Sequence, residues 1–137
     1  MARILIIEDN AANMKLATLL LQKAGHVILS ATDAEVGLST ARTERPDLIL
    51  MDIQLPGMDG LAATVLLKKD PVTAAIPIIA LTAMAMKDDK EKSILAGCDA
   101  YIAKPLRYQD LYAAIDSLLR VAGSPAVGPA DAEATPA

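Results

Sequence analysis

Polar side chains stand at the ends of four short apolar runs in this sequence. The runs, each with the residues that follow it, are 3–7 with Glu8 and Asp9, 48–51 with Asp52, 76–81 with Thr82, and 100–103 with Lys104. A short apolar run closed by turn residues is typical of a buried strand. Because open α/β sheets keep their binding sites at the carboxyl ends of the strands, we expect these side chains to meet at one edge.

Three carboxylates in this set, on Glu8, Asp9 and Asp52, indicate a metal-dependent phosphoryl site. Bare carboxylates this close together would repel one another. A hard divalent cation removes that conflict, and Mg²⁺ uses one or two carboxylates while leaving positions for water and phosphate oxygens. The ion also neutralises charge on a phosphoryl group in transfer, so Asp52 could act as the nucleophile and form an acyl phosphate.

The remaining polar ends suit the phosphoryl group itself. Lys104 supplies a compact positive charge, and Thr82 supplies a hydroxyl donor. The backbone N–H groups of Ile53 and Ala83 would complete the cradle. Each residue alone also has a structural explanation, since a strand-end Asp commonly caps a turn and a Lys extends to solvent. Those explanations do not account for four polar strand ends occurring together.

Apolar runs alternate with helical patterns along the whole chain. The predicted strands are 3–7, 26–31, 48–51, 76–81 and 100–103, and the predicted helices are 11–23, 32–45, 60–69, 86–96 and 108–119. This alternation predicts an α/β fold in which helices cover both faces of a five-stranded parallel sheet, with right-handed crossovers. Residues 1–120 would form one domain, and residues 121–137, rich in Ala and Pro, a disordered tail.

The helix ends carry recognisable signals. Asn10 is the expected cap of the first helix, and Thr32 with Glu35 forms a capping box for the second. Pro46 prevents that second helix from continuing. We expect Cys98 to pack as a small apolar residue rather than to act as a nucleophile.

Composition excludes several functional classes. The 137 residues have a hydrophobic content of 53%, three Tyr and no Phe or Trp, so the core must be aliphatic. A formal net charge of −4 disfavours nonspecific binding of nucleic acid. One Cys allows no intramolecular disulfide, and one His cannot supply a usual zinc site. The chain has no apolar stretch of membrane-spanning length and no signal peptide pattern, so we expect a cytoplasmic protein.

Several segments together resemble the receiver domain of two-component response regulators. They are Ile6-Ile7-Glu8-Asp9-Asn10, Asp47-Leu48-Ile49-Leu50-Met51-Asp52, Pro56-Gly57-Met58-Asp59-Gly60, Leu81-Thr82-Ala83 and Tyr101-Ile102-Ala103-Lys104-Pro105. The resemblance covers essentially residues 2–120 and implies a flavodoxin-like (CheY-like) doubly wound fold with strand order 2-1-3-4-5. Within the family the chain is most similar to free-standing regulators of the DivK type, through residues 82–87 and 97–101.

The resemblance also assigns roles at the site. It implies that Asp52 is the phosphoacceptor and that Asp52, Asp9 and the backbone carbonyl of Gln54 bind Mg²⁺. Glu8 would act on the ion through water, because many receivers have Asp where this chain has Glu.

The same resemblance assigns a switch and a partner surface. Thr82 and Tyr101 would form the switch pair, and Lys104 would contact the phosphoryl group. A histidine kinase or a histidine phosphotransfer protein would donate the phosphoryl group. A downstream protein would bind the face formed by the fourth helix, fifth strand and fifth helix, where the apolar segment 84–86 suits a partner. We expect a monomer that is not an enzyme beyond autophosphorylation and slow autodephosphorylation.

The sequence leaves other functions open. Within the family, the protein could modulate a kinase or act as a phosphorelay shuttle. A phosphatase of the haloacid dehalogenase class also uses a strand-end Asp with Mg²⁺, but it needs a second Asp two residues later, where this chain has Gln54. A flavodoxin-like flavin binder would need a first loop that attracts phosphate, whereas Glu8 and Asp9 would repel one.

Overall fold

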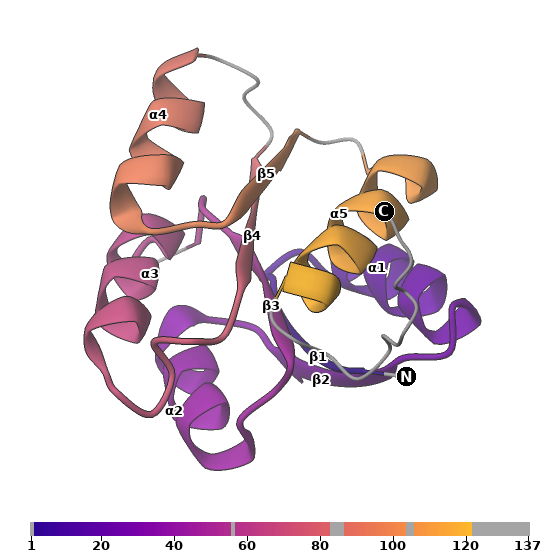
Figure 1. Ribbon diagram of the computed structural model, residues 1–137, viewed down its shortest axis with the longest axis horizontal. Coiled ribbons are helices and arrows are strands. Elements are labelled where there is room, and N and C mark those ends of the chain that lie inside the picture. The colour runs from indigo at the N-terminus through magenta and orange to yellow at the C-terminus, as the bar shows by residue number, and fades with distance from the viewer. Residues whose placement is uncertain (1, 56, 83–86, 104–105, 122–137) are drawn as a thin grey trace.

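The protein is a parallel sheet between two layers of helices (Figure 1). A computed structural model describes residues 2–55, 57–82, 87–103 and 106–121. The strands are β1 (Arg3–Ile7), β2 (Val27–Ala31), β3 (Leu48–Asp52), β4 (Ile78–Thr82) and β5 (Ala100–Ala103). The helices are α1 (Ala11–Lys23), α2 (Ala34–Glu44), α3 (Gly60–Lys69), α4 (Lys87–Ala96) and α5 (Tyr108–Val121).

The sheet order is β2-β1-β3-β4-β5, and every pair of neighbouring strands is parallel. This confirms the predicted fold class and strand order. Ile7 at the end of β1 pairs with Met51 of β3, and Asp52 pairs with Leu81 of β4. The carboxyl ends of the central strands therefore lie side by side, which is where the sequence predicts the site.

Two aliphatic cores lie on opposite faces of the sheet, because neighbouring residues of a strand point to opposite faces. Ile4 and Ile6 of β1 belong to the core beneath α1 and α5. Leu5 and Ile7 belong to the core beneath α2 and α3. Figure 1 shows the same division, with α1 and α5 on one side of the sheet and α2, α3 and α4 on the other.

Helix caps agree with the sequence in part. Asn10 caps α1 as predicted, since its side chain accepts a hydrogen bond from the N–H of Asn13 at 2.9 Å. The predicted capping box at Thr32 is wrong. Asp33 is the cap of α2, and its carboxylate accepts from the N–H of Val36 at 2.8 Å. Asp is as good a cap as Thr, so two adjacent candidates compete for the position.

Strand and helix boundaries shift by one or two residues from the predictions. β2 begins at Val27 rather than at 26, and β4 begins at Ile78, directly after Pro77. α2 ends at Glu44, and Arg45 follows in the left-handed conformation with φ of 49°. The next residue is a proline, which disfavours the α conformation for the residue before it and so ends the helix there.

The last helix continues to Val121, two residues past its predicted end. The predicted tail, 121–137, otherwise lies outside the described residues. Every helix in the part of the chain that the structure describes falls short of the length and apolar character that a membrane span requires.

Candidate phosphoryl and metal site

Three carboxylates meet at the carboxyl ends of β1 and β3. Glu8 and Asp9 follow the last residue of β1, and Asp52 is the last residue of β3. One oxygen from each of Glu8, Asp9 and Asp52 lies within 4.8 Å of the others. Glu8 and Asp52 are each only 2% exposed, whereas Asp9 is exposed to solvent. The structure therefore brings together the three carboxylates that the sequence singles out.

Hydrogen bonds from nearby backbone N–H groups orient the two buried carboxylates. Asp52 Oδ1 accepts from the N–H of Gln54 at 2.9 Å. Glu8 Oε2 accepts from the N–H of Asn10 at 3.1 Å. In both cases the donor lies two residues further along the chain, as in the turns that Asp commonly forms. These bonds fix the direction of each carboxylate before any ligand arrives.

The charge at this edge suits a small divalent cation. Two buried carboxylates beside a third, exposed one repel one another in a region of low dielectric, where Coulomb energies are larger than in water. Carboxylate oxygens are the ligands that Mg²⁺ prefers, and the ion needs only one or two of them. Burial of Glu8 and Asp52 therefore fits a site in which a cation balances the charge.

The turn after β3 is held tightly against the phosphoacceptor candidate. Gly60 begins α3, and its N–H donates to the carbonyl of Ile53 at 3.3 Å. A Cβ atom at Gly60 would lie 2.6 Å from Cα of Ile53 and would also overlap the carbonyl oxygen of Asp52. Only glycine allows this approach, so α3 rests directly on the backbone that carries Asp52.

The structure does not support the predicted role of the Ile53 N–H. That group donates to the carbonyl of Leu81 at 3.0 Å, as part of the pairing between β3 and β4. The N–H of Gln54 points at the Asp52 carboxylate instead. Backbone N–H groups alternate in direction along a strand, so the donor beside the carboxylate depends on the register with β4. The Asp-x-Gln spacing, typical of an Asp turn, was the available sequence signal for Gln54.

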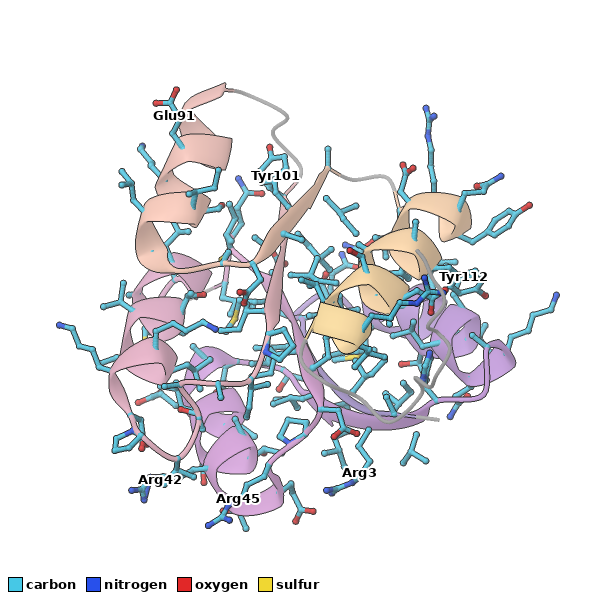
Figure 2. The ribbon with its side chains drawn as sticks, viewed as in Figure 1. Arg3, Arg42, Arg45, Glu91, Tyr101 and Tyr112 are labelled. Atoms are coloured by element: carbon cyan, nitrogen blue, oxygen red, sulfur yellow. The ribbon has the colours of Figure 1, made fainter. Side chains whose placement is uncertain are left out.

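Thr82 and Tyr101 lie on neighbouring strands and on the same face of the sheet. Thr82 ends β4 and is fully buried, and Tyr101 in β5 is half-buried. The register pairs Ala80 with Tyr101 and Thr82 with Ala103. Registered partners point to the same face and so do residues two apart, which puts Thr82 and Tyr101 on one face. Figure 2 shows Tyr101 close to the upper end of β5.

Two predicted phosphoryl contacts, Lys104 and the N–H of Ala83, lie outside the described residues, as does the apolar segment 84–86. Their roles stay predictions. Cys98 is half-buried against the core beneath α2 and α3, as expected of a small apolar residue. Burial raises the pKa of the Cys98 thiol, which makes it a poor nucleophile at neutral pH.

Comparison with known proteins identifies the family. The profile described as response regulator receiver domain matches residues 4–116. The chain belongs to this family. It is 45% identical over 116 residues to the polar-differentiation response regulator DivK of Brucella anthropi, covering 85% of this chain and 94% of the relative. The DivK protein of Brucella ovis is 44% identical with the same coverage. This receiver thus spans nearly the full length of those relatives.

Solved receiver structures have the same fold. A putative response regulator from Chloroflexus aurantiacus superposes with a TM-score of 0.84 at 29% identity, covering 87% of this chain and 98% of the other. The receiver domain of a sensor histidine kinase from Pseudomonas aeruginosa superposes with a TM-score of 0.79 at 35% identity, covering 90% and 98%. In that second structure a magnesium ion is coordinated in the active site cleft.

Proposed function

We propose that this receiver accepts a phosphoryl group from a phosphohistidine onto Asp52 in a Mg²⁺-dependent reaction. The observation that carries the proposal is the approach of Glu8, Asp9 and Asp52 to within 4.8 Å of one another. Asp9, Asp52 and the backbone carbonyl of Gln54 would hold the ion, with Glu8 acting through water. The magnesium-bound receiver among the structural neighbours supports this assignment by similarity.

The transfer itself needs little from the protein beyond position and charge. A carboxylate oxygen of Asp52 attacks the phosphorus, and the N–P bond breaks as the new O–P bond forms. The electron pair of the broken bond stays on the imidazole, which takes a proton from solvent. When bound, Mg²⁺ neutralises charge on the transferring group. The N–H of Gln54 holds the Asp52 carboxylate in place at 2.9 Å, and Lys104 would contact a phosphoryl oxygen.

Thr82 and Tyr101 are the proposed route from the phosphoryl group to the surface. Thr82 ends the strand next to β3, so its hydroxyl would turn toward a phosphoryl oxygen on Asp52. Tyr101, on the same face, would fill the space that Thr82 leaves. The surface formed by α4, β5 and α5 would then shift from one conformation toward another, as when a ligand binds one of two conformations more tightly.

Exposed apolar side chains on α4 support output through protein contact. Ile94 and Leu95 are 58% and 86% exposed. Two neighbouring large apolar groups open to solvent suit contact with a partner protein. The upstream partner would be a histidine kinase or a histidine phosphotransfer protein, and the downstream partner a protein such as a kinase under its control. Gln54 in place of a second Asp argues against turnover of an external phosphate ester.

A phosphorylation assay tests the proposal directly. The wild-type protein is incubated with acetyl phosphate, with Mg²⁺ or with chelator, and the covalent phosphate is measured by intact mass. With Mg²⁺ we expect label on wild type and none on Asp52→Asn, and with chelator we expect no label on either protein. Asp110→Asn changes an exposed carboxylate in the first turn of α5 and is the matched control, which should label like wild type. Label on Asp52→Asn would overturn the assignment. Return of label from wild type to a histidine phosphotransfer protein would favour a phosphorelay shuttle.

A further inference from the structure

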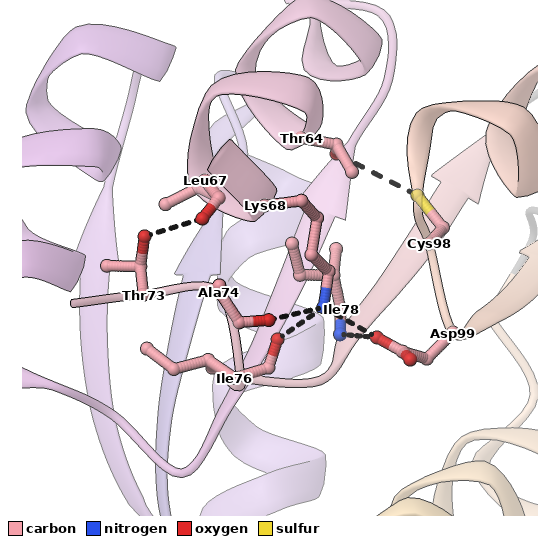
Figure 3. A network of polar contacts seen from close by, with 9 residues as sticks. All are labelled: Thr64, Leu67, Lys68, Thr73, Ala74, Ile76, Ile78, Cys98 and Asp99. Atoms are coloured by element: carbon pink, nitrogen blue, oxygen red, sulfur yellow. Dashed lines mark hydrogen bonds and ion pairs between the residues drawn. The ribbon is translucent and has the colours of Figure 1, made fainter. Parts of the chain in front are cut away.

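Thr64 of α3 is buried, and its side chain lies against Cys98, two residues before β5 (Figure 3). Its hydroxyl donates to the carbonyl of Gly60 at 2.8 Å. The same oxygen accepts from the thiol of Cys98, with an Sγ to Oγ1 distance of 3.8 Å. Thr64 thus joins the first turn of its own helix to Cys98, which lies 34 residues further along the chain. A valine would have the same shape and would make neither hydrogen bond.

At one end, this contact reaches Asp52 through a rigid approach. Gly60 packs on the peptide between Asp52 and Ile53 so closely that a Cβ atom would overlap it. The N–H of Gly60 also donates to the carbonyl of Ile53 at 3.3 Å. A shift of the first turn of α3 is therefore transmitted to the backbone that carries the phosphoacceptor.

At the other end, Cys98 lies between α4 and β5. Its N–H donates to the carbonyl of Ser93 at 3.0 Å, and this hydrogen bond ties Cys98 to the end of α4. The residue before it, Gly97, has φ of 109°, a conformation that glycine adopts easily and other residues rarely do. The residue after it, Asp99, is held to Ile78 of β4 by two hydrogen bonds, at 2.8 and 2.9 Å. Cys98 therefore lies between β5, whose start is hydrogen-bonded to β4, and α4, which is followed directly by Gly97.

Lys68 also holds the start of β5 in place. Its ammonium group donates to the carbonyls of Ala74 and Ile76 at 3.3 and 2.9 Å, and to Asp99 Oδ2 at 3.1 Å. Three oxygens around one ammonium hold α3, the start of β4 and the start of β5 together, as Figure 3 shows. A movement of α4 relative to the sheet would then be taken up at Gly97 and Cys98, and Cys98 is the residue that contacts Thr64.

We propose that Thr64 is a positioning residue that couples the backbone around Asp52, with and without a phosphoryl group, to the position of α4. This inference rests on Asp52 being the phosphoacceptor, and it adds a second connection beside the Thr82–Tyr101 pair. α4 carries the exposed Ile94 and Leu95, so the coupled element is part of the proposed partner surface. Linkage requires the effect to run both ways, so a change at the α4 end must change ligand affinity at Asp52.

Thr73 offers a matched control for a purely structural role. Its side chain is as buried as that of Thr64, and its hydroxyl also donates to a backbone carbonyl, that of Leu67 at 2.7 Å. Leu67 lies about two helical turns from Gly60 along α3. Thr64→Val and Thr73→Val each remove one buried hydroxyl of the same kind, and only the first removes the link to Cys98. Thr64→Ser keeps the hydroxyl and is the conservative variant.

The experiment uses beryllofluoride with Mg²⁺ as a mimic of the acyl phosphate, and the thiol of Cys98 as a reporter. Cys98 is the only cysteine of the chain, so a thiol reagent labels one position. Its rate of labelling, with and without beryllofluoride, reports how far the joint between α4 and β5 opens. The ratio of the two rates cancels the direct effect of the Thr64 hydroxyl on the thiol. The affinity for beryllofluoride is measured on the same four proteins.

In wild type we expect beryllofluoride to change the labelling rate, and in Thr64→Val we expect the ratio to approach one. Beryllofluoride affinity should change about fivefold in Thr64→Val, the low end of usual coupling strengths. Thr73→Val and Thr64→Ser should behave like wild type. The inference is overturned if Thr64→Val matches Thr73→Val in both measurements, or if ligand binding leaves the wild-type labelling rate unchanged. Failure of wild type to bind beryllofluoride at all would instead overturn the proposed function.

Discussion

At the scale of single residues, the role of a carboxylate in this protein is decided by its surroundings. Asp59 caps α3 and is exposed, and Asp99 forms an ion pair with Lys68. Asp52 instead is buried beside Glu8, and both are acidic. A cap or an ion pair involves a single carboxylate. Among the described residues, Glu8, Asp9 and Asp52 are the group whose carboxylate oxygens lie close enough together to hold a metal ion, so this group points to a metal and a phosphoryl ligand.

Gly60→Ala should damage both stability and phosphorylation. The added methyl would overlap the backbone of Asp52 and Ile53, so the chain must shift there at a cost of about 1–3 kcal/mol. Urea unfolding and labelling by acetyl phosphate measure the two effects. Gly57→Ala is the control: Gly57 has φ of 73° but open space around it, so only stability should fall, by about 1 kcal/mol. A Gly60→Ala protein with wild-type stability would contradict the rigid approach.

His26 should make stability depend on pH. Burial lowers the pKa of His26, the positive N-terminus lowers it further, and Asp116 opposes the shift. Its Nδ1 accepts from the N–H of Ala2 at 3.1 Å, which requires the neutral ring. The folded state thus disfavours the proton. The contribution of His26 is present above the ordinary histidine pKa of about 6.5 and is lost as pH falls below it.

Urea unfolding of wild type and His26→Gln at pH 7.5 and at pH 5.5 checks this sign. We expect the loss of stability on acidification to be larger in wild type than in the variant, since carboxylates elsewhere titrate alike in both. Equal losses in the two proteins would count against a histidine that is held neutral.

At the scale of elements, the alternation of runs was enough to predict all five strands and all five helices. The boundaries were less predictable, because neighbouring residues compete for one role. Thr32 and Asp33 are both good caps, and in the structure Asp33 takes that position. The left-handed Arg45 is unusual for a residue with a side chain, and Pro46 after it was the sole local indication of the helix end.

The site was predictable only as far as it depends on strand ends. Its three carboxylates follow from the parallel fold. The choice of Gln54 over Ile53 as the donor depends on hydrogen bonding between β3 and β4, which the sequence does not specify residue by residue. The contact of Thr64 with Cys98 joins residues 34 apart, so it follows from packing in three dimensions and from no local pattern.

Lys68→Met should cost more stability than Arg42→Met. The Lys68 side chain is 22% exposed and its ammonium holds three oxygens, whereas the Arg42 side chain is 60% exposed in its ion pair with Asp70. Hydrogen bonds to a charged group contribute about 1.5–3 kcal/mol, and exposed ion pairs about 0–1 kcal/mol. Urea unfolding of both variants measures the difference. Equal losses of stability in the two variants would contradict the role of Lys68 in holding α3, β4 and β5 together.

At the scale of the whole molecule, the strand order explains why the site lies where it does. From β1 the chain passes to α1 on one face, and from β3 it passes to α3 on the other face. The two connections leave in opposite directions, and open α/β sheets bind ligands at the carboxyl ends of such a pair of strands. Glu8 follows β1 and Asp52 ends β3, so the acidic residues lie at that point of the sheet. The same crossover brings α3 against the backbone of Asp52 and lets one helix contact both the site and the start of β5.

Magnesium should stabilise the wild-type protein, and the gain should depend on Asp52. An ion that binds only the folded state adds about 1.4 kcal/mol when its concentration is ten times the dissociation constant. Asp52→Asn removes one of two buried carboxylates, which relieves repulsion with Glu8 and weakens the ion site. With chelator present, we therefore expect Asp52→Asn to be more stable than wild type, and added Mg²⁺ to close that gap. Urea unfolding with and without Mg²⁺ measures both terms, and Asp110→Asn should follow wild type. An equal gain from Mg²⁺ in wild type and Asp52→Asn would mean that the ion binds elsewhere.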